Sequence, residues 1–534
     1  MFSLTRIQMI FILAVLAAVP MWILPVAPLA DWPVHLGISR EIFLLWTGQI
    51  SSQFYHIDSS FLGYASLHGA LTGLQFIFPI EIAGKLVLTA LFVLSAACWW
   101  FFFDRLDPKK TEWCAFGILA NYTSFLYYGT ISYLFALHFG LVWLALGIEA
   151  VRENRPNILP FLLVGLLVYL THGQVFFLLT AALLLIIGYQ RFWKGKPVGE
   201  MVWIPLILLT AFATINMITN PVMTRDYSQM YQVGLCAEQQ VVDATKQQFT
   251  ITNYFFTQFT TGVYHKLSTL NLFSIFGTIF PMGLIAVIAV LLLIQKIAAL
   301  VMESLRTGKT IPQLEEIREK YISFDRFYLG VAAFFLLCFL TTPLDIYLMT
   351  GFADRSILFF FAFLLISIKI EPKHQMIKDI VFVTMVALIL ANIVYQAVIF
   401  TQYAPEQARI LEKIKTISKE IPDDSALFII PANWSEFSLP NKHLSAHYNG
   451  LLLVENPKAY VPGLFLYQDT FILRSDSRSF DDFVTWGPSQ DNYDPKEFGT
   501  LNITKCYSVI PDQYSYYIDP NLELRKNPSG TNRS

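Results

Sequence analysis

The sequence is poor in charged residues for its length. Of 534 residues, 14% are charged and 55% are hydrophobic, and the formal net charge is −2. A soluble domain of this length needs far more surface charge, so the composition excludes a soluble enzyme and predicts a polytopic α-helical membrane protein. The near-neutral balance gives no reason to expect nucleic acid as a partner.

Cysteines and the common catalytic motifs are also scarce. The 5 cysteines are scattered along the chain. Their spacing fits neither a disulfide framework nor a zinc site, so no metal site is expected from them. The chain contains no Walker loop, GxSxG or HExxH motif, and no GxGxxG between a strand and a helix. The enzyme classes that these motifs mark are therefore not indicated.

Long apolar runs are what the sequence has in abundance. They predict about 11 transmembrane helices, of which the first is too long to be a cleaved signal peptide. The expected spans are residues 7–28, 86–103, 113–128, 132–150, 158–170, 175–189, 202–217, 272–294, 327–340, 357–368 and 380–400. We expect residues 36–46 to form an interfacial helix. Residues 61–78, interrupted by glycine, are expected to be re-entrant or interfacial.

Lysine and arginine set the expected orientation. With a cytoplasmic N-terminus, the loops predicted to lie inside hold most of the basic residues, as the positive-inside rule requires. The chain is then expected to be a multi-pass integral membrane protein with its N-terminus in the cytoplasm. We expect a transmembrane domain over residues 1–401, with a first outer loop at 29–85 and a large outer loop at 220–270. Residues 402–534 are expected to form an extracytoplasmic α/β domain with a helix at 405–420 and strands near 426–430, 451–454 and 471–473.

The segment from Ala30 to Leu36 places a carboxylate and an imidazole at the membrane surface. Asp31 and His35 are four residues apart, so a helix would present them on one face. A partly desolvated aspartate can act as a general base toward an acceptor, and the histidine could orient it, share its proton or bind phosphate. The alternative is that Asp31 only caps a helix and His35 is an interfacial side chain.

Four further residues are expected on the same outer side: Tyr128, His172, Asp354 and Arg355. The planar guanidinium of Arg355 suits a phosphate or pyrophosphate. The alternative is an internal pair of Asp354 and Arg355 that only fixes helix packing. His172 either joins the site or bonds to a neighbouring helix.

These motifs together resemble the GT-C superfamily of polyprenyl-phosphate-dependent glycosyltransferases, in particular its poorly characterised bacterial members. The motifs are Asp31-Trp-Pro-Val-His35, Gly129-Thr-Ile-Ser-Tyr133, Tyr169-Leu-Thr-His172, Asp354-Arg355, His443-Leu-Ser-Ala-His-Tyr448 and Tyr460-Val-Pro-Gly-Leu-Phe465.

The resemblance implies inverting transfer of a hexosyl or pentosyl group from a lipid-phosphate-linked donor to an extracytoplasmic glycan, lipid or protein. It implies that Asp31 is the general base, and a divalent cation could assist the leaving phosphate. Two features depart from the family pattern. Asp31 is followed by Trp32 where many members have a second acidic residue, and Trp99-Trp100 is followed by Phe101, which argues against N-glycosylation.

Two other functions remain open. A transporter or flippase of lipid-linked glycans would need a polar path with charged residues deep in the spans, whereas most spans here are apolar at their centres. A non-catalytic partner in envelope glycan assembly would use Asp31 and Arg355 structurally.

Overall fold

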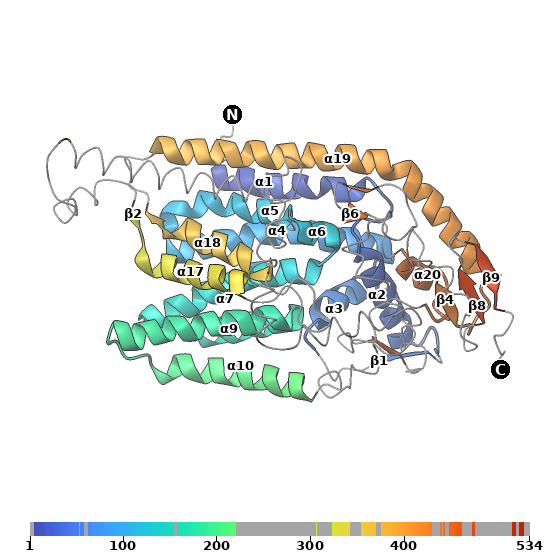
Figure 1. Cartoon of the computed structure of the whole chain (residues 1–534), viewed down its shortest axis with the longest axis horizontal. Helices are drawn as coiled ribbons and strands as arrows, with labels where there is room; N and C mark the ends of the chain where they lie inside the picture. The colour runs from blue at the N-terminus through green and yellow to red at the C-terminus, as the bar shows by residue number, and fades with distance from the viewer. Residues whose placement is uncertain are drawn as a thin grey trace.

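The computed structural model describes residues 5–52, 54–57, 62–153, 157–219, 306, 323–341, 354–369, 375–429, 438–439, 442–443, 448–461, 473–475, 515–518 and 523–527. The predicted outer loop at 220–270 and the predicted span at 272–294 lie outside these residues. The described part is mostly helical (Figure 1).

The helices follow the apolar runs of the sequence. In chain order they are α1 Arg6–Ala18, η1 Val19–Trp22, α2 Trp32–Trp46, α3 Ala65–Leu74, α4 Ile80–Leu106, η2 Pro108–Cys114, α5 Ala115–Asn121, α6 Ser124–Tyr128, α7 Ile131–Glu153, α8 Ile158–Thr171, α9 Gly173–Gly188, η3 Tyr189–Trp193, α10 Glu200–Ile218, α17 Arg326–Thr341, η5 Asp354–Ser356, α18 Ile357–Ser367, α19 Gln375–Glu420 and α20 Gly450–Glu455. Every predicted span within the described residues overlaps one or more of these helices, although the first predicted span, 7–28, is helical only to Trp22.

Four helical segments are long and apolar enough to cross a bilayer. They are Ile80–Leu106, Ile131–Glu153, Gly173–Trp193 and Lys378–Glu420. Shorter apolar helices accompany them at Arg6–Trp22, Ile158–Thr171, Val202–Ile218, Arg326–Thr341 and Ile357–Ser367. This set of apolar helices is compatible with a membrane protein.

The surface of the bundle is apolar along its length. Figure 1 shows α1 and α19 along one long side and α10 along the opposite side. Both sides expose large aliphatic side chains, among them Ile207 and Leu208 of α10 and Val383 and Val394 of α19. Contiguous exposed apolar faces of this kind are unusual in soluble proteins and suit contact with lipid.

The predicted span at 113–128 is broken in the middle. Tyr122 and Thr123 separate α5 from α6, and both residues are fully buried. Irregular backbone is tolerated in such a segment only where protein covers it. Sequence periodicity did not reveal this break, because the residues around it are all compatible with a helix.

A continuous series of hydrogen bonds between buried side chains lies beside the break. Trp99 Nε1 donates to His138 Nδ1 at 3.1 Å, and His138 Nε2 lies 2.8 Å from Asn121 Oδ1. The amide of Asn121 donates to the hydroxyl of Ser95 at 2.9 Å, and Ser95 donates to the carbonyl of Phe92. Both ring nitrogens of His138 therefore have partners, and this buried histidine is structural.

Helix α19 continues through the expected domain boundary. The sequence predicted a span at 380–400 and a separate helix at 405–420, but the structure has one helix from Gln375 to Glu420 with Pro405 inside it. The boundary predicted between residues 401 and 402 therefore falls within a helix.

A small sheet follows α19. It joins β4 (Leu427–Ile429), parallel, to β8 (Tyr516–Ile518), which pairs antiparallel with β9 (Leu524–Lys526). The strand predicted at 426–430 is confirmed by β4. The strand predicted at 451–454 is wrong, because this run forms the helix α20. A short apolar run has no periodicity that distinguishes a helix from a strand.

Helix α20 packs directly on α2, in the region predicted as the first outer loop. A Cβ on Gly37 would lie 2.4 Å from the carbonyl oxygen of Gly450, so both helices need glycine at this crossing. Nearby, β1 (Tyr55–Ile57) pairs antiparallel with β7 (Leu473–Ser475). The region after α19 therefore lies at the same end of the bundle as the loop after α1.

The helix predicted to start at Asp31 and Pro33 and to continue through residues 36–46 is α2, and it is enclosed by protein. Most of α2 is buried, including His35 and Glu41, and it contacts α3, α4 and α20. We had expected it to lie in the membrane interface, but its apolar residues pack against these helices on several sides.

The opposite end of the bundle carries many of the basic residues, and several form ion pairs. Arg6 donates to Glu112 and to Asp379 at 2.7 Å each, which ties α1 to η2 and α19. Here β2 (Ser323–Phe324) pairs with β3 (Ile368–Lys369). We call the end of the bundle that contains Arg6, Lys110 and β3 the basic end.

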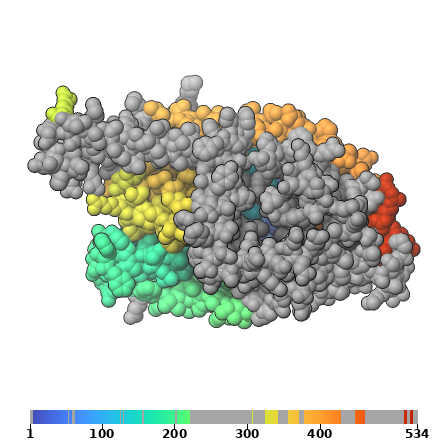
Figure 2. All heavy atoms as spheres, in the orientation of Figure 1, coloured from blue at the N-terminus to red at the C-terminus, as the bar shows by residue number. Residues whose placement is uncertain are grey.

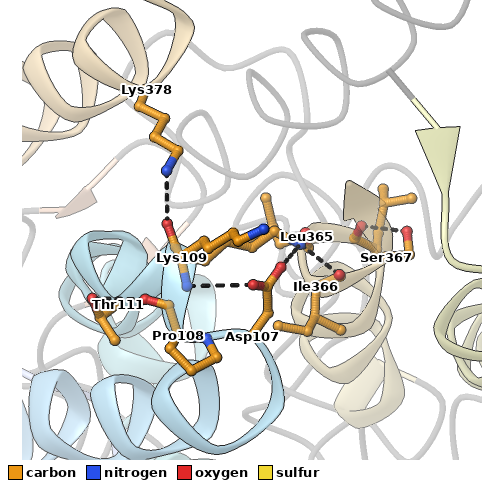
Figure 3. Close-up of polar contacts among 10 residues, drawn as sticks. Asp107, Pro108, Lys109, Thr111, Leu365, Ile366, Ser367 and Lys378 are labelled. Atoms are coloured by element: carbon orange, nitrogen blue, oxygen red, sulfur yellow. Dashed lines mark hydrogen bonds and ion pairs between the residues drawn. The ribbon is translucent and has the colours of Figure 1, made fainter. Parts of the chain in front are cut away.

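Lys110 fixes the last turn of α18 at the basic end. Its ammonium donates to the carbonyls of Ile366 at 2.6 Å and Leu365 at 3.3 Å, and lies 3.1 Å from Asp107 Oδ2. Figure 3 shows Asp107 beside Leu365 and Ile366 at the end of α18. Burial lowers the pKa of Lys110 to about 8, while Asp107 opposes that shift. A cation at a helix C-terminus complements the helix dipole and satisfies carbonyls that have no partner within the helix.

Candidate functional site

Four of the predicted site positions lie next to the beginnings of helices. Asp31 directly precedes α2, and His172 directly precedes α9. Arg355 lies two residues before α18, and Tyr128 lies three residues before α7. A helix N-terminus carries a partial positive charge and free N–H groups, so a group of them favours an anion.

Asp31 is held against the turn that leads into α7. The N–H of Ala30 donates to the carbonyl of Tyr127 at 2.8 Å. Gly129 adopts φ +80°, and a Cβ there would lie 2.7 Å from the nitrogen of Asp31. The sequence predicts that residues 128–130 lie on the same outer side as Asp31, and the backbone of Gly129 contacts that of Asp31. Asp31 stands at the N-cap of α2, but its side chain forms no capping hydrogen bond, so capping does not explain this residue.

His35 lies one turn further along α2 and faces a second histidine. The rings of His35 and His68 are 5.3 Å apart, and the Ser39 hydroxyl lies 2.9 Å from His68 Nδ1. Burial, together with the nearby His35, lowers the pKa of His68 well below its ordinary value. His68 is therefore neutral at physiological pH. The signal that could have identified His68 is a polar residue within the apolar segment 61–78.

Arg355 and His172 meet around Tyr133. The hydroxyl of Tyr133 donates to the carbonyl of Arg355 at 2.8 Å, and the guanidinium lies 5.9 Å from the centre of its ring. The edge of the same ring meets His172, with ring centres 6.0 Å apart. Tyr64 packs on His172 from another side and places its hydroxyl 3.3 Å from Nε2.

Three buried nitrogen atoms in this cluster have no hydrogen-bond partner among the described residues. They are Nε and Nη1 of Arg355 and Nδ1 of His172. Burial and, secondarily, Arg355 lower the pKa of His172, so the imidazole is neutral. When the Tyr64 hydroxyl donates to Nε2, the ring hydrogen lies on Nδ1, which is then a donor without an acceptor.

Helix α3 joins the two histidine clusters. Tyr64 precedes α3 and His68 lies on its first turns, so one short helix reaches both His172 and His35. The Ser66 hydroxyl donates to Thr171 at 2.8 Å, and the N–H of Gly173 donates to the carbonyl of Gly63 at 3.2 Å. With ten residues, α3 is too short to cross a bilayer, in line with the expectation for residues 61–78.

The start of α7 connects Asp31 with Arg355. Gly129, just before α7, touches the Asp31 backbone, and Tyr133, in the first turn of α7, bonds to Arg355. The backbone of Tyr128 ends α6 beside Asp31, and Asp354 opens η5 beside Arg355. The side chains of Tyr128 and Asp354 are outside what the structure describes.

Glu41 is a buried acid that the sequence analysis did not select. It is fully buried, and neither carboxylate oxygen has a hydrogen-bond partner within the described residues. Burial raises its pKa to about 8, with Arg40 opposing. An acid within the apolar pattern of α2 was the signal available. It lies one turn after Gly37, on the face of α2 that meets α20.

No group of three or more His, Cys, Asp or Glu within the described ranges is arranged to hold a metal ion. Comparisons with known proteins gave no match to any family model, curated protein or solved structure. The chemistry of the site must therefore be argued from its own residues.

Proposed function

We propose that this chain is a membrane glycosyltransferase that moves a sugar from a polyprenyl-phosphate carrier to an acceptor. The reaction takes place where the N-termini of α2, α7, α9 and α18 lie. The observation that carries the proposal is Arg355, a partly buried arginine whose Nε and Nη1 have no partner within the described residues. Unpaired buried donors are costly in a folded protein and call for a ligand.

The position of Arg355 strengthens this argument. It lies at the N-terminal side of α18, where the helix dipole disfavours a cation. An anion bound there removes this conflict, because it pairs with the guanidinium and with the helix N-terminus at once. His172 adds a neutral donor beside it. A phosphate matches this combination of fork-shaped and single donors.

Asp31 supplies the second half of the chemistry. Its carboxylate accepts the proton of an acceptor hydroxyl, while that oxygen forms a bond to the anomeric carbon. The bond between the anomeric carbon and the carrier phosphate breaks, and the lipid phosphate leaves with the electron pair. Arg355 stabilises the negative charge on the departing phosphate, and the configuration at the anomeric carbon is inverted. Interactions that strengthen as charge develops are those that raise the rate.

The proposal includes the membrane topology expected from the sequence. About 11 spans, a cytoplasmic N-terminus and an extracytoplasmic region after residue 402 place Asp31 and Arg355 on the outer side. The acceptor is then a glycan, lipid or protein outside the cytoplasm. The contacts of α20 with α2 and of β7 with β1 support a common location for the C-terminal region and the site.

Translocation of a lipid-linked glycan is the second candidate, and His138 bears on it. A polar path needs titratable groups in the spans that can exchange partners. His138, within α7, is instead held in a closed series of hydrogen bonds between Trp99 and Asn121. Among the described residues, the buried nitrogen atoms of Arg355 and His172 that lack hydrogen-bond partners lie at one end of the bundle. This location favours a reaction at the membrane surface over transport through the spans.

The test is a gene deletion complemented with variants of the full chain. Mass spectrometry of surface glycans and lipid-linked sugars measures the product and the donor. With Asp31→Asn, we expect the glycosylated product to disappear and the lipid-linked sugar to accumulate at unchanged protein level. Asp423→Asn is the matched control, because Asp423 is exposed and pairs with Lys458 at the surface. Normal product with Asp31→Asn would refute the proposed base.

A further inference from the structure

The basic end contains a second site for an anion, at the opposite ends of helices α7, α9 and α18 from the N-termini described above. A cavity of about 640 Å³ opens between the ends of α7 and α9, the turn η3, the start of α17 and β3. Figure 2 shows the end of α9 and α17 next to each other at this end of the molecule. The volume is that of an ordinary small-molecule site.

The lining of this cavity is strongly cationic. Arg152, Lys194, Arg326 and Lys369 line it, together with a single carboxylate, Asp325. That carboxylate is engaged with its own chain, since Oδ1 accepts from the N–H of Phe327 at 2.9 Å. No ion pair within the described residues joins any of the four cations to an acid.

The arrangement of these cations differs from that of the paired ones nearby. Arg6 and Lys110 at the same end are bonded to carboxylates or carbonyls. The guanidinium of Arg152 instead lies 4.9 Å from the centre of the Tyr328 ring. Arginine held on an aromatic face keeps its N–H groups directed outward, which suits an oxyanion.

Exposed aromatic side chains border the same cavity. Trp193 lines it and is 80% exposed, and its neighbour Phe192 is 88% exposed. Large aromatic residues at the end of an apolar helix are typical of the boundary between hydrocarbon and headgroups. A basic cavity beside such residues can hold a phosphate while the attached chains remain in lipid.

We propose that this cavity binds the phosphate headgroup of an anionic phospholipid. Lys194, Lys369 and Arg326 contact the phosphate, Arg152 lies at the wall, and Trp193 lies against the glycerol and acyl region. The bound phosphate holds the end of η3 and the start of α17 together. It contacts cations on both elements that form no ion pair with an acid among the described residues. The site is separate from the proposed sugar-transfer site, and neither proposal depends on the other.

Native mass spectrometry of the full-length protein in detergent tests this site. The probes are phosphatidylglycerol, phosphatidylcholine and inorganic phosphate. We expect preferential retention of phosphatidylglycerol, and a loss of about 10- to 30-fold in its apparent affinity in the double variant Lys194→Gln/Lys369→Gln. Arg105→Gln is the matched control, because Arg105 is at the same end but pairs with Glu149 and does not line the cavity.

Each other outcome would overturn the proposal. Equal retention of phosphatidylglycerol and phosphatidylcholine would remove the role of the charge. Inorganic phosphate that displaces phosphatidylglycerol at equal concentration would show that a free anion, and not a lipid, is the ligand. Equal losses of affinity for phosphatidylglycerol in the double variant and in Arg105→Gln would show that general surface charge, and not the cavity, binds the lipid. Arg326→Gln, at an exposed position, repeats the test if the double variant folds poorly.

Discussion

Arg6 and Lys110 at the basic end differ from Arg355 and His172 at the opposite end in whether their hydrogen-bonding groups have partners. At the basic end, Arg6 bridges two carboxylates and Lys110 bonds to the last carbonyls of α18. At the opposite end, Arg355 and His172 keep buried donors without partners in the described structure. The same helix, α18, has Lys110 where its dipole favours a cation and Arg355 where its dipole opposes one. The first placement stabilises the fold, and the second is the basis of the proposal that Arg355 binds a phosphate.

Changes at the two ends should therefore fail in different measurements. Replacing a residue at the Arg355 end should abolish product formation and leave the melting temperature nearly unchanged. Replacing a paired residue at the basic end should lower stability and leave the rate per folded molecule unchanged. The following predictions are arranged from the largest expected effect to the smallest.

Asp31→Asn should lower the transfer rate by about 10²- to 10⁴-fold, because the amide cannot accept the acceptor's proton. Asparagine has the same shape as aspartate and keeps one oxygen that accepts hydrogen bonds, so the melting temperature should stay close to that of the wild type. The rate is measured on the purified full chain with a polyprenyl-phosphate sugar. A large fall in melting temperature with an unchanged rate would make Asp31 structural.

Arg355→Lys should lower the rate by roughly 10²-fold, because lysine keeps the charge but loses the planar fork. Arg409→Lys is the control, since Arg409 makes a two-pronged contact with Glu406 on the exposed part of α19. An Arg355→Lys enzyme with the wild-type rate would show that bidentate recognition of phosphate is not needed.

Lys110→Met should destabilise the protein by about 1–3 kcal/mol, since it removes charge-assisted hydrogen bonds to the α18 carbonyls. The rate per folded molecule should not change, because Lys110 lies at the basic end. Thermal unfolding in detergent and active-site-normalised rates separate the two quantities. A variant as stable as wild type would contradict the capping role.

Glu41 should make stability fall as pH rises. Its pKa in the folded protein is about 8, above the ordinary value near 4.5, so the folded state binds more protons than the unfolded state between these pH values. Stability is therefore greatest below about pH 4.5 and is lost as pH rises through 8. Glu41→Gln should remove this pH dependence and raise the free energy of unfolding by at least roughly 1 kcal/mol at pH 8. Parallel pH profiles of variant and wild type would contradict the assignment.

The apolar runs predicted the helices well, because burial in lipid or in a helical core leaves a strong compositional signal. The break between α5 and α6 could not be predicted, since Tyr122 and Thr123 are held there by burial and not by local preference. The helix α20 was mistaken for a strand because a four-residue apolar run has no period. The union of two predicted helices in α19 shows that proline alone does not mark an end.

The candidate site was predictable in part. Asp31, His172 and Arg355 carried a signal because ionisable groups beside apolar runs are rare. His68, Tyr64 and Tyr133 acquire their roles only through contacts between helices distant in sequence. Their part in the site depends on tertiary geometry, which periodicity does not encode.

A structure of the full chain determined with polyprenyl monophosphate tests the central claim most directly. The account predicts the phosphate within hydrogen-bond distance of Arg355 Nε or Nη1 and close to His172 Nδ1, with the Asp31 carboxylate facing the same space. A phosphate bound only at the basic end, or an Arg355 paired internally in the presence of the ligand, would contradict it.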